Sequence, residues 1–113
     1  MIRKWIKKTK DNRELKKSNW GRKFGWYIEY HGENIGELID YQWNDMFWDS
    51  YIIKSLDDKW NPSLEDAGSW IDFKFKNKYY DLYADAIPED RVVYRVILNQ
   101  RVKMRGLYLN KLH

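Results

Sequence analysis

The sequence predicts a single all-β domain, a six- or seven-stranded antiparallel sandwich or open barrel built from hairpins, with at most one short helical turn. Three observations predict this class. Short segments alternate apolar and polar residues with a period of two, turn signals recur about every eight to twelve residues, and no long segment has a helical period. In addition, 18% of the 113 residues are aromatic. Disordered chains are poor in such residues because they cannot offset their ordering entropy by burial.

The first elements are an arm and a hairpin. Residues 1–19 place a few apolar side chains among many lysines and arginines, which predicts a basic, mobile N-terminal arm before a β domain at 20–113. Residues 24–41 predict a β-hairpin, because Phe24, Trp26, Ile28 and Tyr30 alternate with more polar neighbours. The turn is expected at residues 31–34, where glycine and asparagine tolerate positive φ, and Gly36 is expected to mark a bulge.

The most aromatic stretch is residues 41–51, in which six of eleven side chains are aromatic or methionine. Residues 42–56 fit two patterns, a strand with Trp43, Phe47, Tyr51 and Ile53 on one face, or a helix beginning at Asn44. Periodicity over so short an apolar run cannot choose between them. The enrichment in aromatic and β-branched residues favours the strand.

The second half of the chain predicts a loop and four more strands. Within the loop at 55–69, Asn61 and Pro62 followed by Gly68 favour one helical turn. The expected strands cover residues 70–75, 79–86, 91–98 and 101–109. In the last of these, Gly106 is expected to shift the buried face, because Val102 and Met104 precede it in one phase and Leu107 and Leu109 follow in the other.

Charge is strongly segregated along the chain. Residues 1–23 carry ten lysines and arginines against two acids, and residues 91–113 carry six against none. Residues 24–90 carry five against fifteen acids. Basic ends therefore flank an acidic middle, although the formal net charge of the whole chain is only +4.

Several classes of function find no support in the sequence. The chain has no cysteine, which excludes disulfides, thiol catalysis and thiolate-bound metal, and no apolar run approaches the about 18 residues of a membrane span. Its two histidines, His31 in a predicted turn and His113, have no zinc-type spacing with other ligands. No phosphate-binding glycine loop or nucleophile elbow is present. We therefore expect a cytoplasmic protein that is not an enzyme and takes no metal or cofactor.

Two binding hypotheses remain for this predicted monomer or weak homodimer. The first is a protein partner, recognised by an aromatic and acidic face comprising Asp40, Trp43, Asp45, Trp48 and Asp49. The alternative is single-stranded nucleic acid bound by basic and aromatic segments 20–26 and 101–108, through Trp20, Arg22, Lys23, Arg101, Lys103 and Arg105. Alternatively, the basic N-terminal segment is a solvated arm that takes no part in binding. Whether the basic residues share one face with exposed rings decides between these hypotheses.

Overall fold

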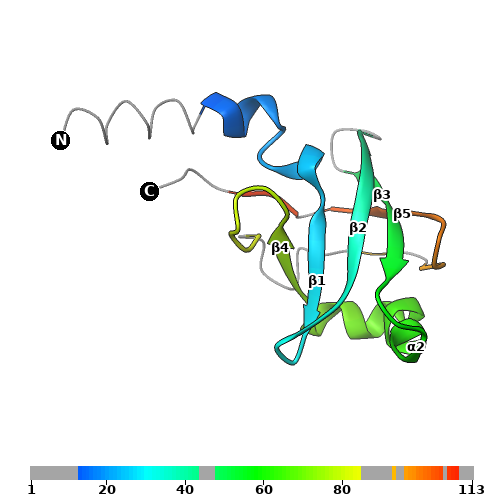
Figure 1. Ribbon diagram of the computed structural model, residues 1–113. Helices are drawn as coiled ribbons and strands as arrows, with labels where there is room; N and C mark the ends of the chain where they lie inside the picture. The colour runs from blue at the N-terminus through cyan, green and yellow to red at the C-terminus, as the bar shows by residue number, and fades with distance from the viewer. Residues whose placement is uncertain (1–12, 44–47, 85–92, 94–95, 106, 110–113) are drawn as a thin grey trace.

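The computed structural model describes residues 13–43, 48–84, 93, 96–105 and 107–109. Within them it contains one antiparallel sheet in the order β4-β1-β2-β3-β5 (Figure 1). The strands are β1 (Trp26–Tyr30), β2 (Glu33–Trp43), β3 (Asp49–Ser55), β4 (Lys74–Asn77) and β5 (Arg101–Met104). The mostly β class is confirmed. The predicted number of strands was too high, since the described residues form five.

The first hairpin is confirmed, with β1 and β2 joined at His31 and Gly32, whose φ angles of 51° and 82° are left-handed. The strand begins two residues later than predicted, because Arg22–Phe24 form a short 3-10 helix, η1. The bulge also occurs. Ile28 pairs with Gly36 and Glu29 with Asn34, so that Ile35 is the extra residue.

The aromatic stretch forms the second hairpin. Its strand character is confirmed at both ends, since β2 extends to Trp43 and β3 begins at Asp49, and these two residues pair. A single continuous strand through residues 41–51 is wrong, because the chain reverses direction within it; residues 44–47, including Asp45, lie outside the described part. The register shifts between Ile39 and Gln42, where Asp40 has a φ of 54°.

Residues 56–72 contain more helical turns than predicted. The expected turn is α2 (Asn61–Glu65), flanked by the 3-10 helices η2 (Asp58–Trp60) and η3 (Ala67–Asp72). The predicted strand at 70–75 is therefore mostly wrong. The Asp66 carboxylate accepts hydrogen bonds from Gly68 N and Ser69 Oγ, which starts η3, and Trp70 Nε1 donates to Leu64 O at 2.9 Å, which holds the indole inside the core.

The strands predicted at 79–86 and 91–98 are reduced to single bridges in the part of the chain that the structure describes. Tyr83 bridges to Lys76 and Val93 to Met104. The strand after β4 is interrupted because Asn77 Oδ1 accepts hydrogen bonds from Tyr79 N and Tyr80 N, which turns the chain. Residues 85 and 86 of the first predicted strand, and residues 91, 92, 94 and 95 of the second, lie outside the described part.

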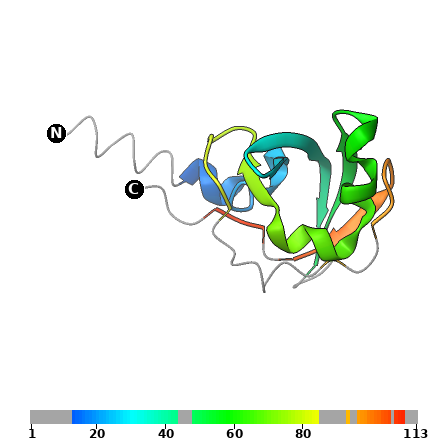
Figure 2. The same ribbon diagram turned by 90° about the horizontal axis from the view of Figure 1, so that it is seen from below.

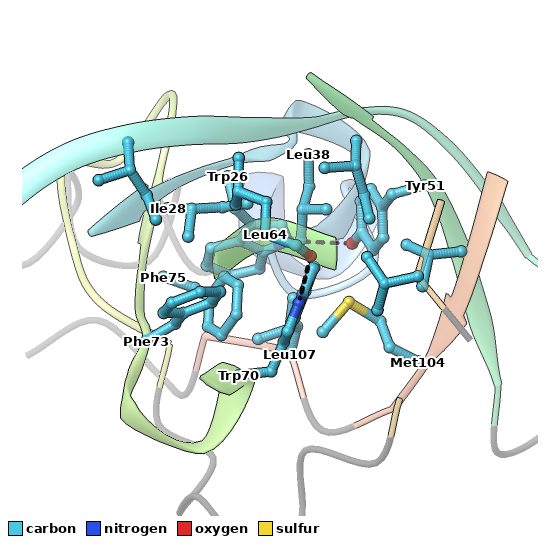
Figure 3. Close-up of a cluster of buried hydrophobic side chains, with 14 of the residues drawn as sticks. Trp26, Ile28, Leu38, Tyr51, Leu64, Trp70, Phe73, Phe75, Met104 and Leu107 are labelled. Carbon is cyan, nitrogen blue, oxygen red and sulfur yellow. Dashed lines mark hydrogen bonds between the residues drawn. The ribbon is translucent and has the colours of Figure 1, made fainter. Parts of the chain in front are cut away.

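The core lies on one face of the curved sheet, and residues 56–72 cross its concave side (Figures 2 and 3). Val102, Met104, Leu107 and Leu109 are all buried, so the predicted change of phase around residue 106 is confirmed. Apolar side chains of the strands meet those of the crossing segments there, including Trp26, Ile28, Leu38, Tyr51, Leu64, Trp70, Phe73 and Phe75.

The two ends of the sheet differ in charge. At one end lie residues 13–24, 78–80 and the described part of 103–109, which we call the basic–aromatic end; they contain eight lysines and arginines and one acid, Glu14. Asp49 of β3 also reaches this end, where it is ion-paired with Arg22. At the other lies the acidic end, residues 56–72 around α2, with five acids and one lysine (Figure 1). Within the described residues, no helix is long and apolar enough to cross a membrane.

Candidate functional site

The basic–aromatic end is organised by an unusual backbone after the helical residues 13–17. Asn19, Trp20 and Gly21 have left-handed φ angles of 53°, 58° and 87°. Trp20 N donates to Leu15 O at 2.8 Å, and Asn19 N donates to Lys16 O at 3.1 Å, the pattern of a Schellman helix end. Asparagine and glycine tolerate this conformation, but a bulky tryptophan rarely adopts it. Such strain clusters at functional positions, so Trp20 marks this segment as a candidate site.

The strained segment is held by parts of the chain that are distant in sequence. Leu109 N donates to Trp20 O at 2.7 Å, and Asn77 Nδ2 donates to Gly21 O at 2.7 Å. A Cβ atom at Gly21 would lie 2.8 Å from Asn77 Nδ2 and 2.9 Å from Leu109 Cδ1. The described parts of both basic termini therefore meet here, as the nucleic-acid hypothesis requires.

An open pocket of about 420 Å³ lies at this junction, lined by Asn19, Trp20, Arg22, Tyr108 and Leu109. The Arg22 guanidinium carbon lies 5.6 Å from the centroid of the Tyr108 ring, in a cation–π arrangement. The volume is within the usual range of small-molecule sites, about 300–1,000 Å³. The pocket thus offers an indole, a phenol, a cation and an amide to a ligand.

Four polar side chains form a closed ring behind the pocket. Asn19 Nδ2 donates to Tyr41 Oη, and Tyr41 Oη donates to Asp49 Oδ1 at 2.9 Å. Asp49 Oδ2 is ion-paired with Arg22 Nε at 2.8 Å, and Arg22 Nη1 donates to Asn19 Oδ1 at 3.3 Å. Asp49 is only 7% exposed, and its carboxylate holds Arg22 directly and Asn19 through Tyr41, two side chains that line the pocket.

The tyrosines of this region stay protonated at neutral pH. Burial and the hydrogen bond to Asp49 raise the pKa of Tyr41 to about 12. Burial also raises the pKa of Tyr51, whose hydroxyl accepts from Trp26 Nε1 at 2.9 Å and donates to Arg22 O at 3.2 Å. Neither hydroxyl is therefore poised to exchange a proton near neutral pH.

Four of the remaining predicted site residues form two pairs. Arg101 donates to the side chain and the carbonyl oxygen of Asp40, and the guanidinium of Arg105 lies over the Trp48 ring at 5.8 Å. Trp43 is 66% exposed. Lys23 and Lys103 are exposed as well. The acidic residues of the protein-partner hypothesis and the basic residues of the nucleic-acid hypothesis therefore do not form two separate surfaces.

Sequence reasoning missed several residues of this region: Asn19, Tyr41, Leu109 and the exposed ring of Tyr79. One signal was available for the first, because a polar helical stretch followed by Asn19, Trp20 and Gly21 has the form of a helix end with a left-handed cap. The others depend on contacts between distant segments.

No cluster of three or more histidine or acidic side chains suited to a metal ion occurs among the residues that the structure describes. Comparison with known proteins adds nothing to the site. No family model, curated protein or solved structure matches the chain.

Proposed function

We propose that the protein binds single-stranded nucleic acid at its basic–aromatic end. The observation that carries the proposal is the pocket in which Trp20 and Arg22 of the N-terminal basic segment meet Tyr108 of the C-terminal one. Binders of this class combine cations along the phosphate backbone with rings on which bases stack, each stack contributing about 1–3 kcal/mol.

The distribution of charge supports an anionic ligand at this end. The exposed side chains of Arg13, Lys16, Lys17 and Lys23 lie near the pocket along the chain, and the acids of the opposite end are separated from them by the length of the sheet (Figure 1). Residues 1–12, which lead into this segment, contribute five more lysines and arginines against one acid. Such a field steers a polyanion toward one end of the molecule.

The polar ring supports a fixed rather than an adaptable site. The ion pair with Asp49 anchors Arg22 through Nε, and the hydrogen bond to Tyr41 anchors the amide of Asn19. Side chains held in this way lose little further entropy when a ligand binds. Of the acids that the protein-partner hypothesis needs at the surface, Asp49 is buried against Arg22, and the exposed Asp40 is ion-paired with Arg101.

The experiment is an amide NMR titration with a mixed-sequence single-stranded oligonucleotide at about 50 and 200 mM salt. Shifts should include residues 19–23 and 107–109 and stay within the basic–aromatic end, and the affinity should fall steeply with salt because counterions are released on binding. Tyr108→Ala, which removes a ring that is 37% exposed and outside the polar ring of four side chains, should weaken binding about tenfold. Unchanged spectra at both salt concentrations would refute the proposal.

A second candidate is a protein partner at the tip of the β2–β3 hairpin. It is favoured by Trp43, whose side chain is exposed at the end of β2, since tryptophans of this kind dominate many interfaces. Trp43→Ala is therefore the matched control for Tyr108→Ala. It should leave the oligonucleotide affinity unchanged, whereas a protein partner recovered by the wild type and lost by Trp43→Ala would support the second candidate.

A further inference from the structure

Three rings that lie outside the pocket form an ordered cluster at the same end of the sheet. Phe24 and Tyr79 are stacked, with centroids 4.5 Å apart and planes inclined by 16°. Tyr80 is nearly perpendicular to both rings, at 5.7 Å from Phe24 and 4.9 Å from Tyr79. None of the three lines the pocket.

The distances show on which side of the stack the third ring lies. If Tyr80 covered the outer face of Tyr79, its distance from Phe24 would approach the sum of the other two separations. The three separations instead form a nearly equilateral triangle, so Tyr80 lies beside the stack and supports both rings. The outer face of Tyr79 is therefore turned away from this cluster, and the residue is 66% exposed.

The backbone around these rings is fixed. Lys78 N donates to Gly25 O at 3.1 Å, and Asn77 Oδ1 caps the turn that carries Tyr79 and Tyr80. Holding an exposed aromatic pair in this orientation leaves a flat apolar face presented to solvent. Lys23, the residue before Phe24 in η1, is exposed as well. Single-stranded nucleic acids are bound by such rings, on which unpaired bases stack, together with cations of the same region that contact the phosphates.

From this geometry we infer that Tyr79 is a second stacking subsite, on which an unpaired base extends the Phe24–Tyr79 stack while a neighbouring nucleotide occupies the pocket. The inference rests on the proposed function and adds a prediction to it, namely that the affinity depends on the length of the bound strand. Trp20 and Phe24 are four residues apart, so their Cα atoms are separated by at most about 14 Å, a span that a few nucleotides cover. One nucleotide fills only the pocket, and a longer strand reaches both subsites.

The test compares a thymidine mononucleotide with oligothymidylates of about four and eight nucleotides, using labelled strands and fluorescence anisotropy for the longer ligands and NMR shifts for the mononucleotide. Wild-type affinity should rise with length. Tyr79→Ala should bind the eight-nucleotide strand with about tenfold lower affinity than wild type, and the mononucleotide with unchanged affinity. Tyr79→Phe should retain the wild-type affinity for both ligands, because its ring face is intact.

Two controls make the result specific. Tyr83→Ala removes another exposed tyrosine, whose ring already faces the Lys76 ammonium at 5.8 Å, and should leave all affinities unchanged. A proline-rich peptide is titrated in parallel, because aromatic ridges also recognise such peptides. The fold of each variant is checked by its amide spectrum.

The outcomes separate the two proposals. If no ligand binds the wild type, the proposed function fails, and this inference fails with it. If the long strand binds wild type and Tyr79→Ala equally, only the second subsite is refuted. Equal losses of affinity in Tyr79→Ala for ligands of every length would place Tyr79 in one site shared with the pocket, and would also refute the second subsite. Binding of the peptide at Tyr79, without the oligonucleotide, would identify a peptide-binding surface instead.

Discussion

The two ends of the sheet are stabilised in different ways. The acidic end is one continuous segment, in which Asp57 and Asp66 accept hydrogen bonds from the backbone N–H groups of Lys59 and Gly68, two residues further on. The basic–aromatic end joins segments that are distant in sequence, as in the hydrogen bond from Asn77 to Gly21. The hydrogen bonds that shape the turns of the first are mostly local, although Leu64 and Trp70 anchor it in the common core, whereas those of the second join distant segments.

This difference has a functional consequence. A site whose side chains are positioned by long-range contacts is rigid in the native state and absent from the unfolded chain. The proposed ligand would therefore bind only the folded protein and stabilise it by mass action. Substitutions in the polar ring should reduce the stability of the fold and the affinity for the ligand together, whereas substitutions of the exposed capping acids at the acidic end should affect only stability, and only slightly.

The largest effect is expected at Asp49. Asp49→Asn removes the partner of Arg22 in a mostly buried ion pair, and should lower the free energy of unfolding by about 3–5 kcal/mol, as measured by urea denaturation. Asp40→Asn is the matched control, because its ion pair with Arg101 is exposed and contributes about 0–1 kcal/mol. Equal losses of unfolding free energy in the two variants would mean that the polar ring does not stabilise the basic–aromatic end.

Two glycines with the same φ of 82° give the next comparison. A Cβ atom at Gly25, beside the basic–aromatic end, would lie 2.5 Å from Leu38 O, whereas a Cβ atom at Gly32, in the β1–β2 turn, would meet nothing within 4 Å. The positive φ costs Gly32→Ala about 1–2 kcal/mol. Gly25 also has a ψ of −179°, a combination that is essentially confined to glycine, and the clash there adds about 1–3 kcal/mol. The midpoint temperature of thermal unfolding should therefore be clearly lower for Gly25→Ala than for Gly32→Ala. The reverse order would contradict the close contact described at Gly25.

Alkaline pH should act on the basic–aromatic end through its tyrosines. Folding raises the pKa of Tyr41 from 10.0 to about 12, so between these values the folded chain keeps a proton that the unfolded chain releases. The resulting stabilisation is fully present below about pH 10 and is lost as the pH rises toward 12. Tyr41→Phe should be less stable than wild type near pH 8, where its two hydrogen bonds are missing, but should lose less stability on going to about pH 11. An identical decline in both proteins would show that Tyr41 does not contribute.

Sequence reasoning succeeded where the determinants are local. The β1–β2 hairpin followed from alternation and a turn with Gly32, and α2 followed from Pro62 near its start, although its N-cap is Trp60 and not the predicted Asn61. It failed where the hydrogen bonds of a nearby side chain favour a helical turn over the strand that the alternating pattern predicts. Residues 70–75 alternate like a strand, but the carboxylate of Asp66 starts a 3-10 helix just before them, and the hydrogen bond of Trp70 to Leu64 O completes it.

The candidate site was predictable in its residue types but not in its pairing. Arg22 and Asp49 belong to two rival predicted surfaces, and only the folded sheet brings them to 2.8 Å. Periodicity carries no information about contacts between residues so far apart in sequence. The backbone of Trp20 was hidden only in part, because its hydrogen bond to Leu15 O is local, whereas the hydrogen bond from Leu109 N to Trp20 O joins distant segments.

The smallest effect tests the local character of the acidic end. Asp57→Ala removes the hydrogen bond that the carboxylate accepts from Lys59 N at 3.0 Å, and should lower the free energy of unfolding by about 1 kcal/mol. Asp58→Ala removes the same charge from the next residue, which caps no backbone group among the described residues, and should change stability by less than about 0.5 kcal/mol. Because the basic–aromatic end shares no hydrogen bond with this turn, both variants should bind oligonucleotide as wild type does. A loss of affinity in either would mean that the two ends are coupled through the sheet.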